Sequence, residues 1–214
     1  MKLRLTIEHL NKSYGTLPVL RDLNLSLTTP DRYCLMSPSG SGKTTLFRIL
    51  MGLETADSGT VSLSQCSEGS WLPLDREQAR VAAVFQEDRL IEHLSPLEQG
   101  ALFCEKAMRP LLRAEFLRLL PEECLDRPVS LLSGGMRRRC ALLRAILAPS
   151  RLLLLDEPFT GLDEQTKKEA ARYLLERQNG RLLLLSSHSR EEAALLNAVI
   201  LQPPGFLSTP PGTP

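Results

Sequence analysis

The chain has 214 residues, of which 43% are hydrophobic and 24% charged, with a formal net charge of +1. This composition is typical of a folded globular protein, and a charge near zero gives no support for a nucleic-acid-binding or anionic-membrane-binding surface. No run of about 18 apolar residues occurs, so no segment is predicted to span a bilayer.

The N-terminal part of the chain predicts strands. Residues 2–10, 19–27 and 59–64 alternate apolar and polar side chains, as expected of antiparallel strands with one buried face. The first of these segments has no signal-peptide core, so we expect a cytoplasmic protein. Residues 64–80, which include Trp71, contain two turn-prone patches and are predicted to form a loop between strands.

A phosphate-binding loop is predicted at residues 37–45, SPSGSGKTT, between an apolar strand (RYCLM) and a helix (TTLFRILMG). Lys43 would reach the β- and γ-phosphates of a nucleotide, and the Thr44 hydroxyl would ligate Mg²⁺. Ser37 stands where the motif has its first glycine, which strains the loop if that position needs a positive φ and is a mild change otherwise. The alternative is a Gly/Ser-rich surface loop with a chance lysine.

Helices are predicted in the middle of the chain. Gln86 follows a short apolar strand, and Ser95 to Glu98 form a capping box with proline at the first helical position. Helical periodicity runs from about Leu111 to Leu120. Residues 88–130 therefore look like an all-helical insertion.

A second anion site is predicted where Ser133, Gly134 and Gly135 open a helix, because the serine hydroxyl, the backbone N–H groups and the helix dipole all favour an anion. The alternative is a capped amphipathic helix with a basic face. Four leucines at 152–155 then form a buried strand that ends in Asp156, at the edge where open α/β sheets bind ligands.

Asp156 could hold Mg²⁺ through its water shell, and Glu157 could accept a proton from an attacking water. The alternative for this pair is a polar strand end that leads into a turn. Leucines at 182–185 place His188 at the equivalent edge of a neighbouring strand, although a lone histidine there is more often structural than catalytic. The five cysteines lack Cys-x-x-Cys spacing and are interpreted as reduced core residues.

The order of these motifs resembles the nucleotide-binding subunit of ABC transporters. The resemblance implies that Gln86 reports Mg²⁺ and water to a partner protein, that Ser133–Gly135 is the signature segment, and that His188 contacts the γ-phosphate. It also implies that TGLD, which ends at Asp163, crosses a dimer interface, and that Tyr14 stacks on adenine. Four positions bear on the match: Met136 and Arg138 stand where glutamine is usual, whereas Arg139 and Arg144 agree with the family pattern.

The resemblance predicts an α/β fold, a P-loop NTPase core with flanking antiparallel β-strands and an inserted helical subdomain at about 88–130. One ABC ATPase domain is expected at 1–202, followed by a disordered tail at 203–214. The expected catalytic residues are Glu157, His188 and Gln86, and the expected metal-binding residues are Thr44, Gln86 and Asp156. The expected nucleotide-binding residues are Tyr14, Ser39, Gly40, Ser41, Gly42, Lys43, Thr44, Thr45, Ser133, Gly134, Gly135 and Asp163.

The implied function is ATP hydrolysis with Mg²⁺ that powers transport, in a head-to-tail dimer of two copies that encloses two ATP molecules. The implied partners are membrane permease subunits with a solute-binding protein, which would hold the chain on the inner face of the cell membrane. FQEDRL resembles importers of the nitrate, sulfonate and taurine group. The alternatives are an exporter or lipoprotein-extraction ATPase, a soluble ABC ATPase, and a non-hydrolysing subunit, the last suggested by Ser37 and by Ser189, which replaces the usual aspartate.

Overall fold

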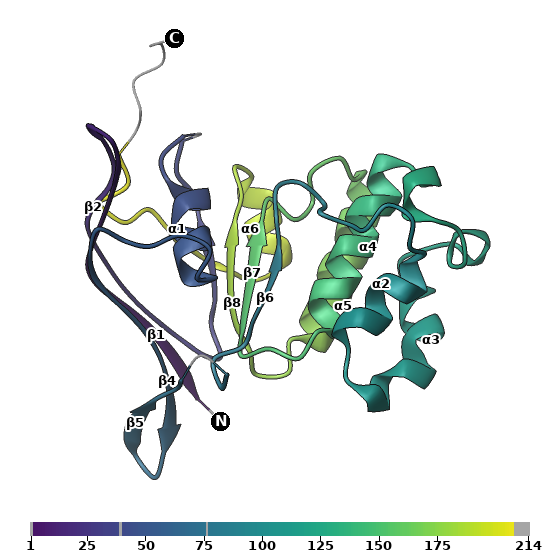
Figure 1. Cartoon of the computed structure of the whole chain (residues 1–214), viewed down its shortest axis with the longest axis horizontal. Helices are drawn as coiled ribbons and strands as arrows, with labels where there is room; N and C mark the ends of the chain where they lie inside the picture. Colours follow the sequence, from purple (N-terminus) through teal and green to yellow (C-terminus); the bar gives the residue numbers. More distant parts are fainter. Residues whose placement is uncertain (1, 39, 76, 208–214) are drawn as a thin grey trace.

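A pair of β-sheets, one antiparallel and one parallel, forms the framework of the computed structural model, which describes residues 2–38, 40–75 and 77–207 (Figure 1). The strands are β1 (Leu3–Tyr14), β2 (Leu17–Thr28), β3 (Arg32–Leu35), β4 (Ser58–Ser67), β5 (Ser70–Pro73), β6 (Val81–Val84), β7 (Leu152–Asp156), β8 (Leu182–Ser186) and β9 (Val199–Leu201). The helices are α1 (Lys43–Leu50), α2 (Pro96–Phe103), α3 (Leu112–Phe116), α4 (Gly134–Leu147), α5 (Glu164–Arg177) and α6 (Arg190–Leu195), with short 3-10 turns at Lys106–Leu111, Glu122–Cys124 and Val129–Leu131. The α/β prediction is confirmed.

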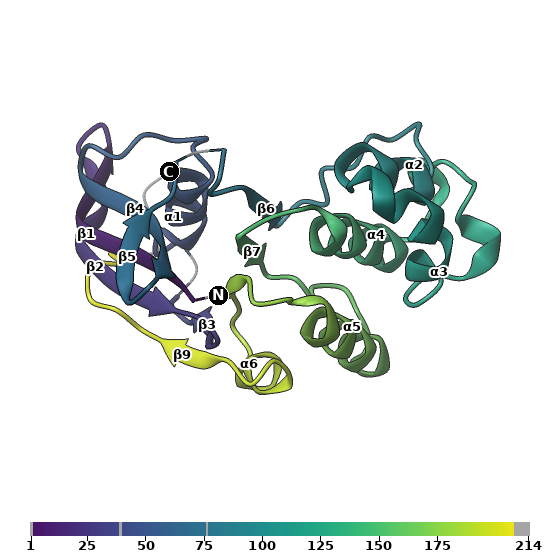
Figure 2. The same ribbon diagram turned by 90° about the horizontal axis from the view of Figure 1, so that it is seen from below.

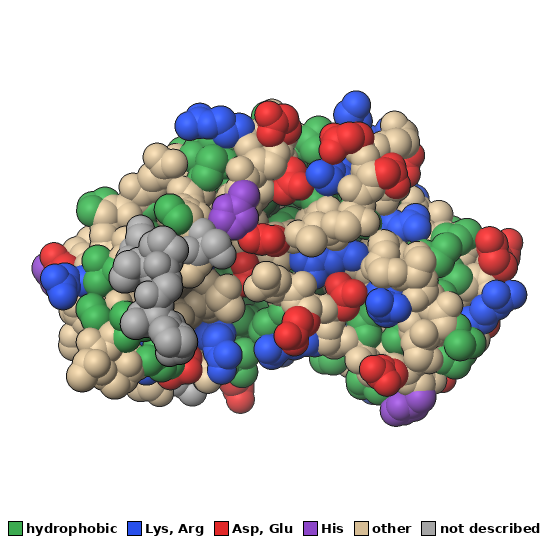
Figure 3. Space-filling model, turned by 90° about the horizontal axis from the view of Figure 1, so that it is seen from above, with side chains coloured by type: hydrophobic (Ala, Val, Ile, Leu, Met, Phe, Trp, Pro, Cys, Tyr) green, Lys and Arg blue, Asp and Glu red, His purple; other side chains and the backbone are tan. Residues whose placement is uncertain are grey.

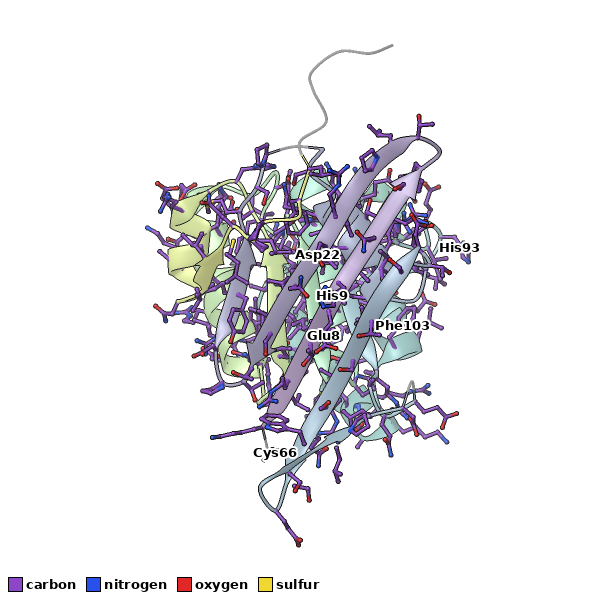
Figure 4. All side chains as sticks on the ribbon, turned by 90° about the vertical axis from the view of Figure 1, so that its left-hand side faces the viewer. Glu8, His9, Asp22, Cys66, His93 and Phe103 are labelled. Carbon is purple, nitrogen blue, oxygen red and sulfur yellow. The ribbon has the colours of Figure 1, made fainter. Side chains whose placement is uncertain are left out.

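The antiparallel sheet has the strand order β2-β1-β4-β5 and contains the three predicted N-terminal strands. Its outer face is polar: His9 on β1 and Asp22 on β2 point toward each other, and His9 Nδ1 lies 2.7 Å from Asp22 Oδ1 (Figure 4). The predicted loop at 64–80 is wrong over its first half, because β4 continues to Ser67 and Trp71 lies on β5, where it pairs with Cys66. The Arg4 guanidinium lies 3.8 Å from the Trp71 ring centroid, so a cation–π contact holds this edge hairpin.

The parallel sheet has the order β6-β7-β8-β3-β9, and it separates two hydrophobic cores. The leucine runs of β7 and β8 are completely buried because their side chains enter both cores in alternation. One core lies between the two sheets and includes Leu46 and Phe47 of α1. The other lies under the remaining helices and includes Leu142 of α4 and Tyr173 of α5.

All regular elements between β6 and β7 are helical, as predicted. The capping box is present, since Ser95 Oγ accepts from the Glu98 N–H and the Glu98 carboxylate accepts from the Ser95 N–H. Helix α3 ends at Phe116, earlier than the periodicity to Leu120 indicated, and Pro121 restricts the backbone just beyond. No described helix is long and apolar enough to cross a membrane.

The predicted disordered tail does not begin at residue 203, because Gly205, Phe206 and Leu207 pack against β2. Phe206 forms a β-bridge with Leu20, and the Gly205 carbonyl accepts a 2.9 Å hydrogen bond from the Arg21 N–H. These main-chain hydrogen bonds and the partial burial of Phe206 order the segment, although its proline-rich composition is typical of disorder. The rest of that predicted tail lies outside the described residues.

A hollow of about 610 Å³ lies at the amino ends of the parallel strands, away from the predicted site. Buried Arg181 on its wall donates to the carbonyls of Ala148 and Arg177, at the ends of α4 and α5. A cation that bonds the last carbonyls of two helices stabilises their negative ends. We therefore assign this arginine a structural role.

Candidate active site

The carboxyl ends of four parallel strands bring the predicted residues to one edge of the sheet. Strand β3 leads into the loop before Lys43, β6 leads to Gln86, β7 ends at Asp156, and β8 leads to His188. Figure 3 looks down on the molecule from above, and side chains of both charges are interspersed across the middle of that face. Parallel strands place all their carboxyl ends together, so motifs far apart in the chain meet there.

Gly42 makes the phosphate loop possible. Its φ is +100°, and a Cβ at this position would come within 2.7 Å of Val19 Cγ1. A larger residue would be both strained and in collision with β2. Next to it, the Ser41 hydroxyl is buried and has no hydrogen-bond partner among the described residues, although buried polar atoms normally have one. An orphaned donor in a loop that opens a helix fits a site for an anion such as a phosphate.

Lys43 is 6% exposed, and its Nζ donates to the carbonyls of Ser37 at 2.6 Å and Pro38 at 2.9 Å. Burial lowers the pKa of the Lys43 ammonium, while the Glu157 and Asp156 carboxylates oppose that shift. Ser37 is not among the described residues with a positive φ, so its replacement of glycine is a mild change. The structure describes the loop on both sides of the predicted Ser39, which itself lies outside the described residues.

The side chains of Thr44, Asp156 and Ser186 meet beside the phosphate loop. Asp156 Oδ2 accepts from the Thr44 hydroxyl at 2.9 Å, and Asp156 Oδ1 accepts from the Ser186 hydroxyl at 2.5 Å. Thr44, Gln86 and Asp156 also line one cavity of about 200 Å³. Hydroxyl, amide and carboxylate oxygens are the ligands that Mg²⁺ prefers, so the donor set fits this ion in the company of phosphate oxygens. The described residues hold no cluster of three or more His, Cys, Asp or Glu suited to a metal.

Sequence reasoning missed Ser186. Its hydroxyl bonds Asp156 and accepts from the Glu157 N–H at 3.1 Å, so it orients both acidic residues. The signal was present, since Ser186 ends the second leucine run and pairs with Asp156 in the parallel register.

Glu157 and His188 form a pair. His188 Nε2 lies 2.9 Å from Glu157 Oε1, and the Thr160 hydroxyl lies 3.4 Å from Glu157 Oε2. The backbone of Glu157 has a φ of +47°, a strained conformation for a residue with a side chain. Such strain concentrates at functional sites, and here it accompanies a carboxylate that is held between two side chains at the sheet edge.

The signature segment has the predicted helix start. Ser133 is the N-cap of α4, its Oγ accepts from the Met136 N–H at 3.3 Å, and Ser133 and Gly134 are exposed. Helices α1 and α4 lie on opposite sides of β6 and β7 (Figure 2). The helix start of α4 is therefore separated from the phosphate loop of its own chain, which begins α1.

The two segments predicted to face a second subunit adjoin each other. A side chain at Gly135 would lie 3.5 Å from the Gly161 carbonyl oxygen. Asp163, however, acts within its own helix: it caps α5 by accepting from the Thr166 N–H at 2.9 Å and from the Thr166 hydroxyl at 2.7 Å. These hydrogen bonds lower the pKa of the Asp163 carboxyl.

Tyr14 is 46% exposed at the end of β1 and pairs with Leu17 across the hairpin. Two residues on, Val19 is the β2 residue that lies against Gly42, so the hairpin adjoins the phosphate loop. The Lys12 ammonium lies 5.2 Å from the centroid of the Tyr14 ring. An aromatic ring placed in this way could present its other face to a base.

Ser189, where the resembling family usually has aspartate, has a role of its own. It is the N-cap of α6 and accepts from the Glu192 N–H at 3.2 Å. Serine and aspartate cap helices about equally well, so this replacement preserves the position of the His188 loop.

Comparison with known proteins agrees with this geometry. The model of a family described as ABC transporter matches residues 20–160. The chain is 38% identical to the sulfate/thiosulfate import ATP-binding protein CysA of Bacillus cereus over 179 residues, which cover 78% of this chain and 49% of that protein. The CysA protein of Bordetella pertussis is 38% identical over 200 residues, which cover 87% of this chain and 55% of that one. The chain thus spans about half the length of these curated relatives.

Solved structures share the fold. An ATP-binding cassette determined as a dimer in a post-hydrolysis state with ADP and phosphate matches with a TM-score of 0.75 at 22% identity, covering 96% of this chain and all of that one. A second structure, described as a dimeric bacterial ABC transporter cassette, matches with the same TM-score at 23% identity. The predicted cassette fold is confirmed.

Proposed function

The chain belongs to the ABC transporter family, and we propose that it is the ATP-binding and ATP-hydrolysing subunit of such a transporter. The observation that carries this proposal is the meeting of Lys43, Asp156 and the Glu157–His188 pair at one sheet edge. In this arrangement Lys43 binds the nucleotide phosphates, and Tyr14 stacks on the base. Ser39, Gly40, Ser41, Gly42, Thr44 and Thr45 are proposed to complete the phosphate site.

The chemistry proposed for this edge is in-line attack of water on the γ-phosphate, which breaks the bond from the γ-phosphorus to the bridging oxygen and releases ADP and phosphate. Glu157 accepts a proton from the water, and His188 holds the Glu157 carboxylate in position from 2.9 Å. Mg²⁺, which Thr44, Asp156 and Gln86 would hold together with the phosphates, would neutralise charge that develops on the phosphate oxygens. The direct test is phosphate release from MgATP by the purified chain, compared with Lys43→Ala. Equal rates for the two proteins would refute the proposal.

A second copy of this chain is proposed to complete each site. The helix start at Ser133, Gly134 and Gly135, of which the first two are exposed, has the chemistry of an anion site but is separated from the phosphate loop of its own chain. In a head-to-tail dimer it would contact the γ-phosphate bound by the other copy, with Asp163 and its loop at the interface. The solved cassettes of this fold are described as dimers, which supports this arrangement.

The membrane partner is proposed to dock where the Gln86 segment meets the helical insertion. Apolar residues gather in this region: Ile91, Leu102 and Phe103 are exposed, whereas Leu90 and Leu97 pack against the core and Leu94 is half-buried. Exposed apolar side chains of this kind could receive a short helix of a permease. This docking would place the chain on the inner face of the cell membrane.

Import of a small solute, with a solute-binding protein as a further component, is the transport direction that we propose. The relatives named for sulfate/thiosulfate import support it and favour a small inorganic anion over the sulfonate-type group.

Cysteines placed one at a time from Arg89 to Leu94 should crosslink to a permease in assembled membranes. If none does so while ATP hydrolysis persists, a soluble ABC ATPase is the better description.

A further inference from the structure

One arginine bonds both halves of the active-site edge. Arg138 lies on α4, one turn into the helix, and is 3% exposed. Its guanidinium bonds the segment after β6, which carries Gln86, and the turn after β7, which carries Glu157. From the sequence, Arg138 was notable only because the resembling family usually has glutamine at this position.

Toward the Gln86 segment, Arg138 uses one terminal nitrogen. Nη1 donates to the Phe85 carbonyl at 2.6 Å, and it lies 3.4 Å from the Gln86 carbonyl and 3.2 Å from Asp88 Oδ1. Asp88 is also the carboxylate that forms an ion pair with this buried guanidinium. The backbone on both sides of the Gln86 side chain is therefore anchored to α4.

Toward the Glu157 turn, Arg138 uses its other two nitrogens. Nη2 donates to the carbonyls of Asp156 at 2.8 Å and Glu157 at 2.5 Å, and Nε donates to the Pro158 carbonyl at 3.0 Å. Three consecutive carbonyls thus face one side chain. Because Glu157 has a φ of +47°, these bonds stabilise a strained backbone from one side while Ser186 bonds the Glu157 N–H from the other.

The geometry requires a guanidinium. Its planar fork carries five N–H donors, which can serve acceptors on two separate segments at once. A lysine ammonium is a single point with three donors, and a glutamine amide has two donors and no charge. A buried cation is also costly unless its surroundings satisfy it, and here every nitrogen has an oxygen partner.

We infer that Arg138 is a positioning residue that rigidly links the Gln86 segment to the Glu157 turn, so that the Glu157 carboxylate follows any displacement of that segment. This inference rests on the proposed ATP hydrolysis. A partner that docks beside Gln86 would then change turnover through one side chain, without contacting the reacting atoms.

The test compares Arg138→Met and Arg138→Lys with Arg144→Met as the matched control. Arg144 is on the same helix and bonds the same segment, and its hydrogen bonds run to the carbonyls of Asp88 and Arg89 rather than to the Glu157 turn. We expect Arg138→Met to lower kcat by between about tenfold and a hundredfold with little change in KM for ATP, as a misplaced catalytic group does. Arg138→Lys should recover part of that loss, and Arg144→Met should leave kcat within about twofold of wild type.

The decisive measurement is a double-mutant cycle. If Arg138 acts through Glu157, Arg138→Lys should lower kcat in the wild-type background and cause no further loss in the Glu157→Gln background. If the losses in kcat caused by Arg138→Lys and Glu157→Gln multiply in the double variant, the inference is overturned. It is also overturned if Arg138→Lys turns over at the wild-type rate. These outcomes differ from failure of the proposed function, in which the wild-type chain itself would not hydrolyse MgATP. Circular dichroism of each variant identifies a protein that has not folded, and Arg138→Lys keeps the test available if Arg138→Met does not fold.

Discussion

His188 Nε2 lies 2.9 Å from Glu157 Oε1, although paired positions of the two leucine strands that carry these side chains to the sheet edge, such as Asp156 and Ser186, lie 30 residues apart in the sequence. Both residues follow the carboxyl ends of neighbouring parallel strands, so the pairing of β7 with β8 brings them together. The side chain of Glu157 is 25% exposed and that of His188 is 48% exposed, which leaves the pair accessible to a substrate. A half-buried carboxylate fixed by a histidine is well placed to accept a proton.

The first prediction separates binding from chemistry at this pair. Glu157→Gln keeps the shape of the side chain and removes the base, so ATP binding should persist while turnover falls by about a hundredfold or more. His188→Ala should also slow turnover, and the double variant should be no slower than Glu157→Gln alone, because His188 acts on the Glu157 carboxylate. Nucleotide affinity and phosphate release give the two readouts. Turnover close to wild type in Glu157→Gln would contradict the assignment.

The second prediction concerns the metal. Thr44→Val removes the hydroxyl that donates to Asp156 Oδ2 at 2.9 Å and that would ligate Mg²⁺. The Mg²⁺ concentration for half-maximal ATP hydrolysis should rise by at least about tenfold, a loss that even outer-shell partners of metal ligands produce. Thr44→Ser retains the hydroxyl and is the control. An unchanged Mg²⁺ requirement in Thr44→Val would remove Thr44 from the metal site.

The third prediction concerns the second copy. Glu157→Gln with ATP should sediment as a dimer, because slow hydrolysis keeps ATP between the two copies. Adding Ser133→Arg should abolish that dimer and leave nucleotide binding largely intact, since Ser133 is exposed on α4, away from the phosphate loop of its own chain. Analytical ultracentrifugation distinguishes the two species. A strictly monomeric chain with full activity would refute the dimer.

The fourth prediction uses the buried thiols. Burial raises the pKa of Cys34 to about 11 and that of Cys140 to about 12, because the thiolate form is poorly solvated there. At pH 8 about one Cys34 in a thousand is then a thiolate, the form that reacts with alkylating agents. In the folded protein these two cysteines should resist iodoacetamide at pH 8, whereas unfolding in guanidinium should expose them. Mass spectrometry of tryptic peptides measures this, and the partly exposed Cys66 is the internal control. Rapid alkylation of Cys34 in the folded chain would show that the core around β3 opens.

The sequence alone was sufficient to predict those features that depend on interactions between residues close together in the chain. The GSGKTT segment between a strand and a helix predicted the phosphate loop, and the structure shows why Gly42 is needed there, with its φ of +100°. The capping box at Ser95 and Glu98 located the start of α2 because its hydrogen bonds join residues three apart. The leucine runs predicted buried parallel strands, and parallel pairing then implied that Asp156 and His188 share one edge.

Only the tertiary structure decided the contacts between distant segments. Apart from the Asp88 carboxylate, the partners of Arg138 are carbonyl oxygens of residues 85 and 86 and of residues 156 to 158, and every residue type carries such an oxygen. No pattern of side chains can therefore indicate them. The same limit applies to Trp71, whose short edge strand is held by pairing with β4 and by Arg4, and to the order of strands, which packing on both faces of the sheet determines. Sequence patterns report periodicity and turn chemistry within a few residues, whereas long-range contacts depend on how the finished elements pack.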